Sequence, residues 1–369
     1  SRGLGEVYKR QEAGLTFGTE TYSATKYFGK FADCSCIRPN YLSYVADPGP
    51  KSFSFGNFEP LDIHGVIESN AIGYGIFVVF SKQVTASSNS ASDHVGNFDN
   101  PKSGTDGLHF YKCNDVWAIG NKVANVGDDG ISSGSFDINY PCTNINFLNN
   151  SLSRVFGTFK LYGFVDKADI AGNTFLTGHE AGVYLTNDNN APQDSYVKNV
   201  KIHHNKFSGI VGGSTNVVAG AVLLRTWPDK LIPQARSTID HIYIEDNIIE
   251  SCGSGVALVT QDTYKRYSNI FIRRNTFKGI DLSLPGSHPY IRIHQCDYQL
   301  EIKDNYFNNA HSHAISVDHI YGSFTASNAS PTWDISDNHI TGYSEGTGLT
   351  ARVNGILVRY SSFSLFLQM

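Results

Sequence analysis

The same short phrase occurs twice in this chain, 23 residues apart. Asp106-Gly107-Leu108 returns as Asp129-Gly130-Ile131, and a hydrophobic segment that ends at Asn121 separates the copies. A step of that length matches one coil of a stacked β-solenoid. If the two copies occupy equivalent strands of successive coils, about 4.8 Å separates their backbones. The repeat therefore predicts two carboxylates side by side.

Asparagine marks the same position in most of the repeats. Eight asparagines are each followed two residues later by a large apolar residue, in steps of 29, 23, 32, 42, 28, 30 and 33 residues. Alternation of apolar and polar residues around them predicts strands with one face inward. The asparagine then lies at a turn, where its amide can bond to the equivalent amides of neighbouring coils. The eight are Asn121, Asn150, Asn173, Asn205, Asn247, Asn275, Asn305 and Asn338.

A second strand follows each asparagine after a short turn, as in Gly182-Val183-Tyr184-Leu185. Two or three strands per coil predict an all-β fold, a right-handed parallel β-helix that forms a single domain. The composition agrees, because 35 Gly, 20 Tyr and 23 Phe occur without long runs of helix-forming residues. A β-propeller or a sandwich is the alternative, but those folds use antiparallel hairpins with two-residue turns, and the chain contains few.

Four segments are predicted along the chain. Residues 1–11 fit no repeat and resemble a translated sequencing adapter, so we interpret them as a non-native leader. Residues 12–62 lack a clear period and are predicted to cap the first coil. The β-helix is predicted to span residues 63–360, and residues 361–369 to be a truncated apolar tail. Met369 is the only methionine, which indicates a fragment or a processed form.

Charge and hydropathy exclude two classes of partner. The charged fraction is 17% and the net charge is −5, so no basic field attracts nucleic acid. No run of 18 or more apolar residues is available for a membrane-spanning helix. The six cysteines are thinly spread, and we interpret them as buried free thiols instead of disulfides or a zinc site.

Three aspartates are the strongest candidates for catalysis. Strand interiors disfavour aspartate, yet Asp106, Asp128 and Asp129 occur at matched places in two repeats. Like charges this close cannot all ionise cheaply, so one group is expected to act as an acid while another activates water or attacks carbon. The alternatives are a tight Asp-Gly turn and a calcium site. The distance between the carboxylates distinguishes a retaining from an inverting enzyme.

Polar and aromatic residues on the outward side of the same strands predict a saccharide-binding face. Aromatic rings stack on sugar rings, and cations pair with sugar carboxylates, although any exposed sheet face carries such residues. An insertion at residues 225–240 is expected on the same face. The substrate-binding candidates are His109, Lys160, Tyr162, Tyr184, Arg225, Trp227 and Arg292, with Arg154, His179 and Glu180 as secondary candidates.

The phrase Thr105-Asp106-Gly107, followed by Gly127-Asp128-Asp129, resembles the fingerprint of polygalacturonases and related family 28 glycoside hydrolases. The resemblance implies an inverting hydrolase in which Asp128 is the general acid, while Asp106 and Asp129 hold the water. Three features depart from that family. Gly104 replaces an asparagine, the family's G-H-G histidine has no counterpart in residues 154–157, and its R-I-K motif is absent.

The repeats from Asp106 to Asn205 are similar to the pectate-lyase-like β-helices of phage tailspikes and bacterial surface-polysaccharide enzymes. That similarity implies a secreted or virion-associated extracellular protein with a polysaccharide substrate, and it suggests a homotrimer. Three functions follow: a glycoside hydrolase that requires no cofactor and no metal, a polysaccharide lyase for which Ca²⁺ is the expected ion, and a non-catalytic spike that binds glycan. The hydrolase is our first hypothesis.

Overall fold

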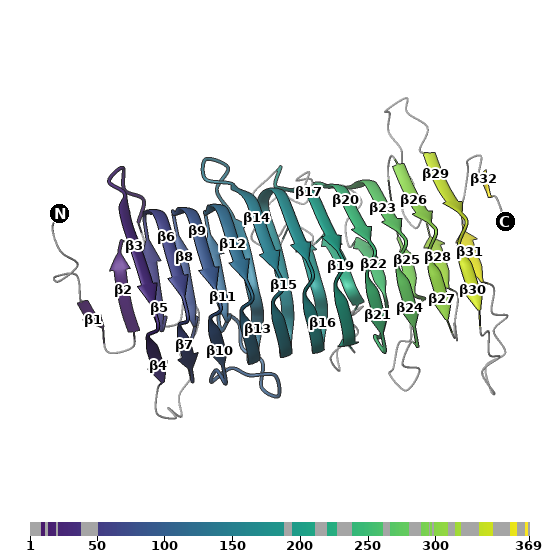
Figure 1. Ribbon diagram of the computed structural model, residues 1–369. Coiled ribbons are helices and arrows are strands. Elements are labelled where there is room, and N and C mark those ends of the chain that lie inside the picture. Colours follow the sequence, from purple (N-terminus) through teal and green to yellow (C-terminus); the bar gives the residue numbers. More distant parts are fainter. Residues whose placement is uncertain are drawn as a thin grey trace. The chain divides into compact units, whose positions relative to one another are not determined.

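The computed structural model describes residues 9–11, 14–19, 21–37, 51–187, 194–210, 220–226, 238–260, 266–279, 289–294, 296, 299–308, 314–318, 332–341, 355–359 and 366–367. Every regular element in these ranges is a β-strand (Figure 1). Equivalent strands of successive coils pair in parallel, and three strands make one coil. The fold is a right-handed parallel β-helix, as the repeats predict.

The chain divides into two compact units, Ser1–Asp169 and Ile170–Met369. In the first unit an inward column runs through successive coils, with Phe53, Ile76, Leu108, Ile131 and Phe159 in register. All five are buried. The strands of this unit are β1 (Lys9–Gln11), β2 (Gly14–Gly18), β3 (Tyr27–Ala32), β4 (Ser35–Ile37), β5 (Phe53–Gly56), β6 (Phe58–His64), β7 (Ile67–Ser69), β8 (Ile76–Val79), β9 (Lys82–Ser87), β10 (Ser90–Ser92), β11 (Leu108–Tyr111), β12 (Asn114–Ile119), β13 (Lys122–Ser135), β14 (Cys142–Leu148) and β15 (Ser151–Ala171).

The second unit repeats the same pattern. Val183, Val222, Val256, Ile291 and Ile315 are in register on successive coils and are fully buried. Its strands are β16 (Thr174–Thr186), β17 (Tyr196–His203), β18 (Lys206–Ile210), β19 (Gly220–Thr226), β20 (Thr238–Glu245), β21 (Ile248–Glu250), β22 (Val256–Thr260), β23 (Arg266–Arg273), β24 (Thr276–Lys278), β25 (Ile291–Ile293), β26 (Gln299–Lys303), β27 (Tyr306–Asn308), β28 (Ile315–Asp318), β29 (Thr332–Ser336), β30 (His339–Thr341), β31 (Ile356–Arg359) and β32 (Phe366–Leu367).

A ladder of asparagine side chains joins the coils of the first unit. Asn121 donates from its side-chain amide to the Ala86 carbonyl and to the side-chain oxygen of Asn150, both at 2.9 Å. Its own side-chain oxygen accepts from the backbone and the side chain of Asn89, both at 3.0 Å. The ladder is the predicted one with an additional rung, because Asn89 is followed two residues later by small Ala91 and the repeat pattern missed it.

In the described part of the second unit the ladder has six rungs, and its residues are those predicted. Each side-chain amide donates to the side-chain oxygen of the next asparagine, at 2.9 Å from Asn173 to Asn205 and at 3.0 Å from Asn205 to Asn247. Asn247, Asn275, Asn305 and Asn338 continue the series. Since most of these amides are buried, the ladder satisfies polar groups that would otherwise be costly inside the coils.

Parallel pairing begins before residue 63, where the sequence predicted the β-helix to start. β2 pairs with β5, and β3 pairs with β6, both in parallel. Part of the predicted cap at residues 12–62 therefore already has the register of a coil. At the other end β32 pairs in parallel with β29, so strand pairing reaches into the predicted tail.

All six cysteines are free thiols, and Cys113, Cys142, Cys252 and Cys296 are buried. The interpretation of these four as buried free thiols is confirmed. Among the described residues, no helix has the length and apolar character that crossing a membrane requires.

We expect Asn121→Leu to lower the free energy of unfolding by about 3 kcal/mol or more, because each buried polar group left unsatisfied costs about 1–3 kcal/mol. Urea denaturation measures the change. Asn338→Leu, at the last described rung, is the matched control. It should cost less, because Asn338 is partly exposed whereas Asn121 is fully buried, and the Asn338 amide donates to backbone carbonyls and to no further asparagine of the described ladder. Equal effects at the two positions would contradict the ladder as the source of stability.

Buried thiols should resist alkylation. Burial raises the pKa of Cys252 to about 12 and the pKa of Cys113 well above its usual range, so neither forms the reactive thiolate near neutral pH. Mass spectrometry after iodoacetamide treatment of the native protein at pH 8 should find label on partly exposed Cys36 and little on those two. Denatured protein is the control, and all cysteines should then react.

Candidate active site

Glycine follows Asp106 and Asp129 because the coils approach each other closely there. A Cβ on Gly107 would lie 2.6 Å from the Gly130 carbonyl oxygen, and a Cβ on Gly130 would lie 2.5 Å from Leu152. Neither glycine has the positive φ that a tight turn would favour. The Gly107 N–H donates to the Asp129 carbonyl oxygen at 3.0 Å. The Asp-Gly phrase thus begins an inward-packed strand, and the tight-turn alternative is wrong.

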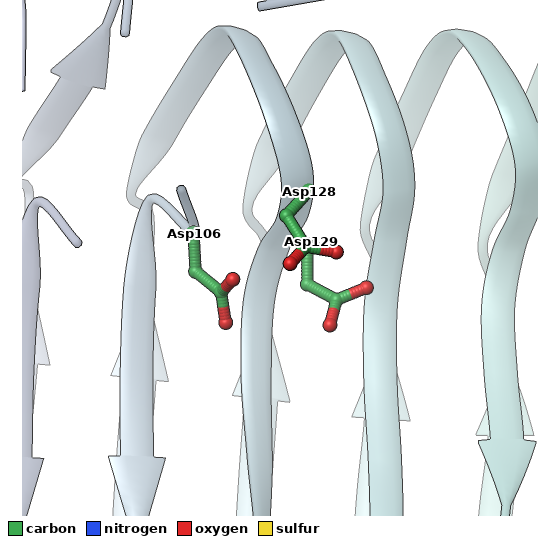
Figure 2. Close-up of side chains that lie close together, drawn as sticks. All are labelled: Asp106, Asp128 and Asp129. Carbon is green, nitrogen blue, oxygen red and sulfur yellow. The ribbon is translucent and has the colours of Figure 1, made fainter. Parts of the chain in front are cut away.

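A β-bulge directs two sequence neighbours to one side of β13. Successive residues of a regular strand point to opposite faces. The register between β13 and β15 shifts between Val126 and Asp129, and such a bulge re-aims the side chains beside it. Figure 2 shows Asp106 on one coil and Asp128 and Asp129 on the next. One carboxylate oxygen from each of the three lies within 4.8 Å of the other two.

Two donors hold one oxygen of Asp106. Nδ1 of His109 lies 2.7 Å from Asp106 Oδ2, and the Ser132 hydroxyl donates to the same oxygen at 2.7 Å. An ionised carboxylate only accepts, so His109 carries a proton on Nδ1. Nε2 of the same ring lies 2.9 Å from the Tyr162 hydroxyl. His109, predicted to bind substrate, is therefore bonded to a candidate catalytic carboxylate.

Tyr162 reaches His109 across one intervening coil, which carries a glycine at the position between them. Tyr111, Gly134 and Tyr162 are in register on successive coils. A Cβ on Gly134 would lie 2.6 Å from the Tyr162 ring, so another residue there would displace the ring. Burial raises the pKa of Tyr162 well above its usual range. Its hydroxyl therefore keeps its proton at neutral pH.

The other two aspartates have partners of a different kind. Lys160 Nζ lies 3.4 Å from Asp129 Oδ2, and this ion pair is largely buried. Asp128 accepts a hydrogen bond at 2.5 Å from the Gly104 backbone N–H. Gly104 has φ +71°, a conformation that favours glycine. Asp128 is partly exposed, whereas Asp106 and Asp129 are buried.

The polar loop before β11 crosses the coil that carries the bulge. The Lys102 N–H donates to the Gly127 carbonyl oxygen at 3.1 Å. A Cβ on Gly127 would clash with the backbone of Gly96, so glycine permits this close crossing. Arg154, a secondary candidate for the site, binds Asp99 of this loop at 2.7 Å. Arg154 thus contacts the loop through an exposed ion pair, and its role in substrate binding stays a prediction.

The three acids fit a calcium ion poorly. A calcium site supplies six to eight oxygen ligands. Asp106 Oδ2 already accepts two hydrogen bonds, and the Lys160 ammonium stands beside Asp129 where a cation would bind. A divalent ion would have to displace that ammonium.

Aromatic rings surround His109. The ring centroids of Tyr74, Phe77 and Tyr162 lie 5.1, 5.4 and 5.9 Å from the His109 centroid. The sequence analysis missed Tyr74 and Phe77 as members of the site. Phe77 pairs in register with His109, so the alignment of the repeated strands contained its signal. Tyr74 precedes the repeated strand, and no repeat marks it.

Two predicted substrate-binding residues are buried in the second unit. Tyr184 is 4% exposed and packs with Leu223 and Ala257. Arg225 is 6% exposed and pairs with Glu180 at 3.3 Å. The expectation that both face solvent is wrong, because neighbouring side chains of the same unit cover them.

His179 and Arg292 are partly exposed, and their binding roles stay predictions. Trp227 lies outside the described residues.

Three solved structures are similar to this fold. An exopolygalacturonase from Thermotoga maritima matches at 14% identity and TM-score 0.52, covering 63% of this chain and 51% of that one. A polygalacturonase from Erwinia carotovora matches at 12% and 0.42, covering 63% and 56%. The catalytic domain of a GH87 α-1,3-glucanase matches at 14% and 0.42, covering 85% and 54%. This chain thus spans about half the length of these proteins.

The sequence itself matches no family model. It matches no curated protein either. The similarity is therefore one of fold, the right-handed parallel β-helix.

Gly134→Ala should displace the Tyr162 ring and lower the free energy of unfolding by about 1–3 kcal/mol, the usual cost of overpacking. Urea denaturation measures the loss, and a crystal structure of the variant would show the hydroxyl moved away from His109. Gly220→Ala is the matched control, because a Cβ there meets other atoms only at 3.4 Å or more. An undisturbed Tyr162 in Gly134→Ala would contradict the packing argument.

Proposed function

We propose that this protein is a glycoside hydrolase that cuts an acidic polysaccharide with Asp106, Asp128 and Asp129. The convergence of three carboxylate oxygens from two coils within 4.8 Å carries the proposal. Hydrolysis of a glycosidic bond requires one carboxylic acid to protonate the leaving oxygen and one carboxylate to activate water. The similarity to an exopolygalacturonase supports this reading at the level of the fold.

The partners of the three acids favour Asp128 as the general acid. Carboxylates this close repel one another when all are ionised, so the three acids together are expected to retain one proton. The Gly104 N–H donates to Asp128, but Asp106 accepts from two side-chain donors and Asp129 lies beside the Lys160 ammonium, so negative charge is stabilised more on those two. Asp128 is more exposed, which allows it to reach a substrate oxygen. The shared proton therefore belongs on Asp128.

A water molecule fits between Asp106 and Asp129. Oxygens within 4.8 Å of each other can both accept from one water at about 2.8 Å. As this water attacks the anomeric carbon, the bond to the leaving oxygen breaks and Asp128 donates its proton to that oxygen. Asp106 or Asp129 takes the proton from the water. A water that attacks opposite the leaving group inverts the anomeric configuration. The oxygens are closer together than the roughly 6.5–9.5 Å that is usual for inverting enzymes, so we base inversion on the resemblance to family 28 glycoside hydrolases and on the pair of acids that hold the water, and not on the separation.

Lys160 and the neighbouring rings suit an acidic sugar. Its ammonium lies beside Asp129 and 5.4 Å from the centre of the Tyr162 ring. A uronate-type carboxylate would pair with such a cation, and a sugar ring can stack on Tyr74, which is partly exposed, whereas Phe77 and Tyr162 are buried. We place the substrate among extracellular acidic polysaccharides, with no cofactor in the reaction. Secretion, attachment to a virion and trimer formation stay predictions.

A polysaccharide lyase is the second candidate, because Lys160 and Tyr162 lie beside the acids. A lyase needs an unprotonated base to remove a proton next to the sugar carboxylate. Burial raises the pKa of Tyr162, so its hydroxyl is a poor base at neutral pH. Lys160 is engaged with Asp129 at 3.4 Å, an ion pair that favours its charged form. Both groups thus suit charge stabilisation better than proton abstraction.

A reducing-sugar assay on a panel of acidic polysaccharides tests the proposal. Asp129→Asn and Asp128→Asn should each lower the rate about 10²–10⁴-fold, the usual contribution of acid–base catalysis. Asp115→Asn is the matched control, because Asp115 lies on β12 and pairs with Asn144, and it should retain the wild-type rate.

Other outcomes separate the alternatives. An ultraviolet-absorbing unsaturated product would indicate a lyase, and binding without release of reducing ends would indicate a glycan-binding spike. Equal rates for wild type and Asp129→Asn would remove the carboxylate mechanism.

A further inference from the structure

A histidine and a glutamate form a fully buried pair behind the candidate site. His94 Nε2 lies 2.7 Å from Glu68 Oε2, and both side chains are 0% exposed. Glu68 comes from β7, and its other oxygen accepts from the Ser52 hydroxyl at 3.2 Å. The reaction proposed above uses neither residue. A buried ion pair commonly adds no more stability than apolar residues of similar volume would. Stability alone therefore does not account for the pair of His94 and Glu68.

The geometry places two protons on His94 when Glu68 is ionised. Nδ1 of His94 lies 3.0 Å from the Thr105 carbonyl oxygen. A carbonyl oxygen only accepts, so Nδ1 must donate. Nε2 must also donate if Glu68 is a carboxylate. The pair therefore satisfies the Thr105 carbonyl and the Glu68 carboxylate together only when the ring is an imidazolium.

The Thr105 carbonyl belongs to the peptide that leads into Asp106. The next carbonyl, that of Asp106 itself, accepts from the Gly75 backbone N–H at 2.9 Å. Two consecutive carbonyls are thus tied down, one by a side chain and one by the neighbouring coil. A Cβ on Gly75 would lie 2.8 Å from Glu68 Oε2, so glycine leaves room for the pair. These contacts orient the backbone from which the Asp106 carboxylate projects.

We propose that His94, held by Glu68, is a positioning residue for Asp106: it clamps the Thr105 carbonyl and places a buried positive charge behind the carboxylate that faces substrate. This proposal rests on the hydrolase function proposed above. The proposal concerns orientation and charge at Asp106, and neither His94 nor Glu68 touches the substrate.

The groups that face His94 explain its charge. Burial of the ring is the largest single influence on the pKa of His94, and it lowers the pKa. Three neighbours act in the opposite direction: Glu68 by its charge and hydrogen bond, the Thr105 carbonyl by its hydrogen bond, and Asp106 by its charge. Together they raise the pKa of His94 above its usual value. Ser52 supports Glu68 from the far side. By reciprocity, the imidazolium stabilises the Asp106 anion.

Stability should follow the same proton. A group whose folded-state pKa is raised contributes its stability fully below the unfolded value, near pH 6.5, and loses it as the pH rises through the folded value. Above pH 6.5 the unfolding equilibrium constant of the wild type should therefore increase by up to tenfold per pH unit until His94 is deprotonated. Glu68→Gln should remove this dependence.

Nitrogen NMR of histidine tests the pair without any substrate. At pH 6.5, the usual pKa of histidine, the wild type should show His94 mainly as an imidazolium, and Glu68→Gln should show it mainly neutral. Asp240→Asn is the matched control, because Asp240 accepts from His241 at 2.7 Å on β20 in the second unit, and it should leave the His94 signal unchanged. A His94 that is mainly neutral in the wild type at pH 6.5 would overturn the proposal, and this measurement needs no folded variant.

Kinetics separate positioning from plain stability. Glu68→Gln should lower kcat at least tenfold, change KM little and move the alkaline limb of the pH profile to lower pH. Folded Glu68→Gln with wild-type kcat and pH profile would reduce the pair to a structural element and overturn the proposal. Asp129→Asn should lower the rate about 10²–10⁴-fold while His94 stays charged. If the wild type cuts no glycan, the hydrolase proposal fails, and the NMR measurement still decides the geometry of the pair.

Discussion

Parallel backbone hydrogen bonds hold each coil in register with the next, and that register decides which side chains become neighbours. The bond from the Gly107 N–H to the Asp129 carbonyl makes the 23-residue step a one-coil step. A slip of one residue would turn the outward face inward. The glycines after Asp106 and Asp129 and the rungs of the asparagine ladder resist such a slip, because each fits only one alignment.

The candidate site is where this regular pattern is broken. A regular β13 would send Asp128 and Asp129 to opposite faces, and the bulge brings both to one. Three acids together are electrostatically unfavourable. The fold offsets that cost with the Lys160 ammonium, with the donors on Asp106 and with the backbone N–H of Gly104. Such local departures from a regular fold are expected at functional sites.

Much of the fold could be predicted from the sequence because its repeats carry their own register. The inward column and the asparagine ladder both followed from spacing alone, and so did the proximity of Asp106 to Asp129. Asn89 was not predicted to belong to the ladder, because its repeat has a small residue where the others have a large one. The start of the coils before residue 63 escaped because that region has no clear period.

Contacts that depend on side-chain direction or on coverage could not be predicted. The sequence places His109 on the outward column. It does not show that the His109 ring turns back onto Asp106. Nor does it reveal that Gly134 lets Tyr162 extend across a coil. Tyr184 sits at an outward position of its strand, yet it is buried, because alternation specifies which face a residue occupies and not what covers that face. Glu68 is in register with Ala91 and Val123, at a position where the repeats carry apolar residues, but the repeats recognised from the sequence began only at Asn121. His94 follows β10, outside the repeated strands, so no pattern marked it.

A crystal structure of the Asp128→Asn variant with a bound acidic oligosaccharide would test the central claim most directly. The account predicts a glycosidic oxygen within about 2.6–3.2 Å of the residue 128 side chain, with a water held between Asp106 and Asp129 on the opposite side of the sugar. An oligosaccharide bound away from these residues, or an Asp106 side chain turned into the apolar interior, would contradict it.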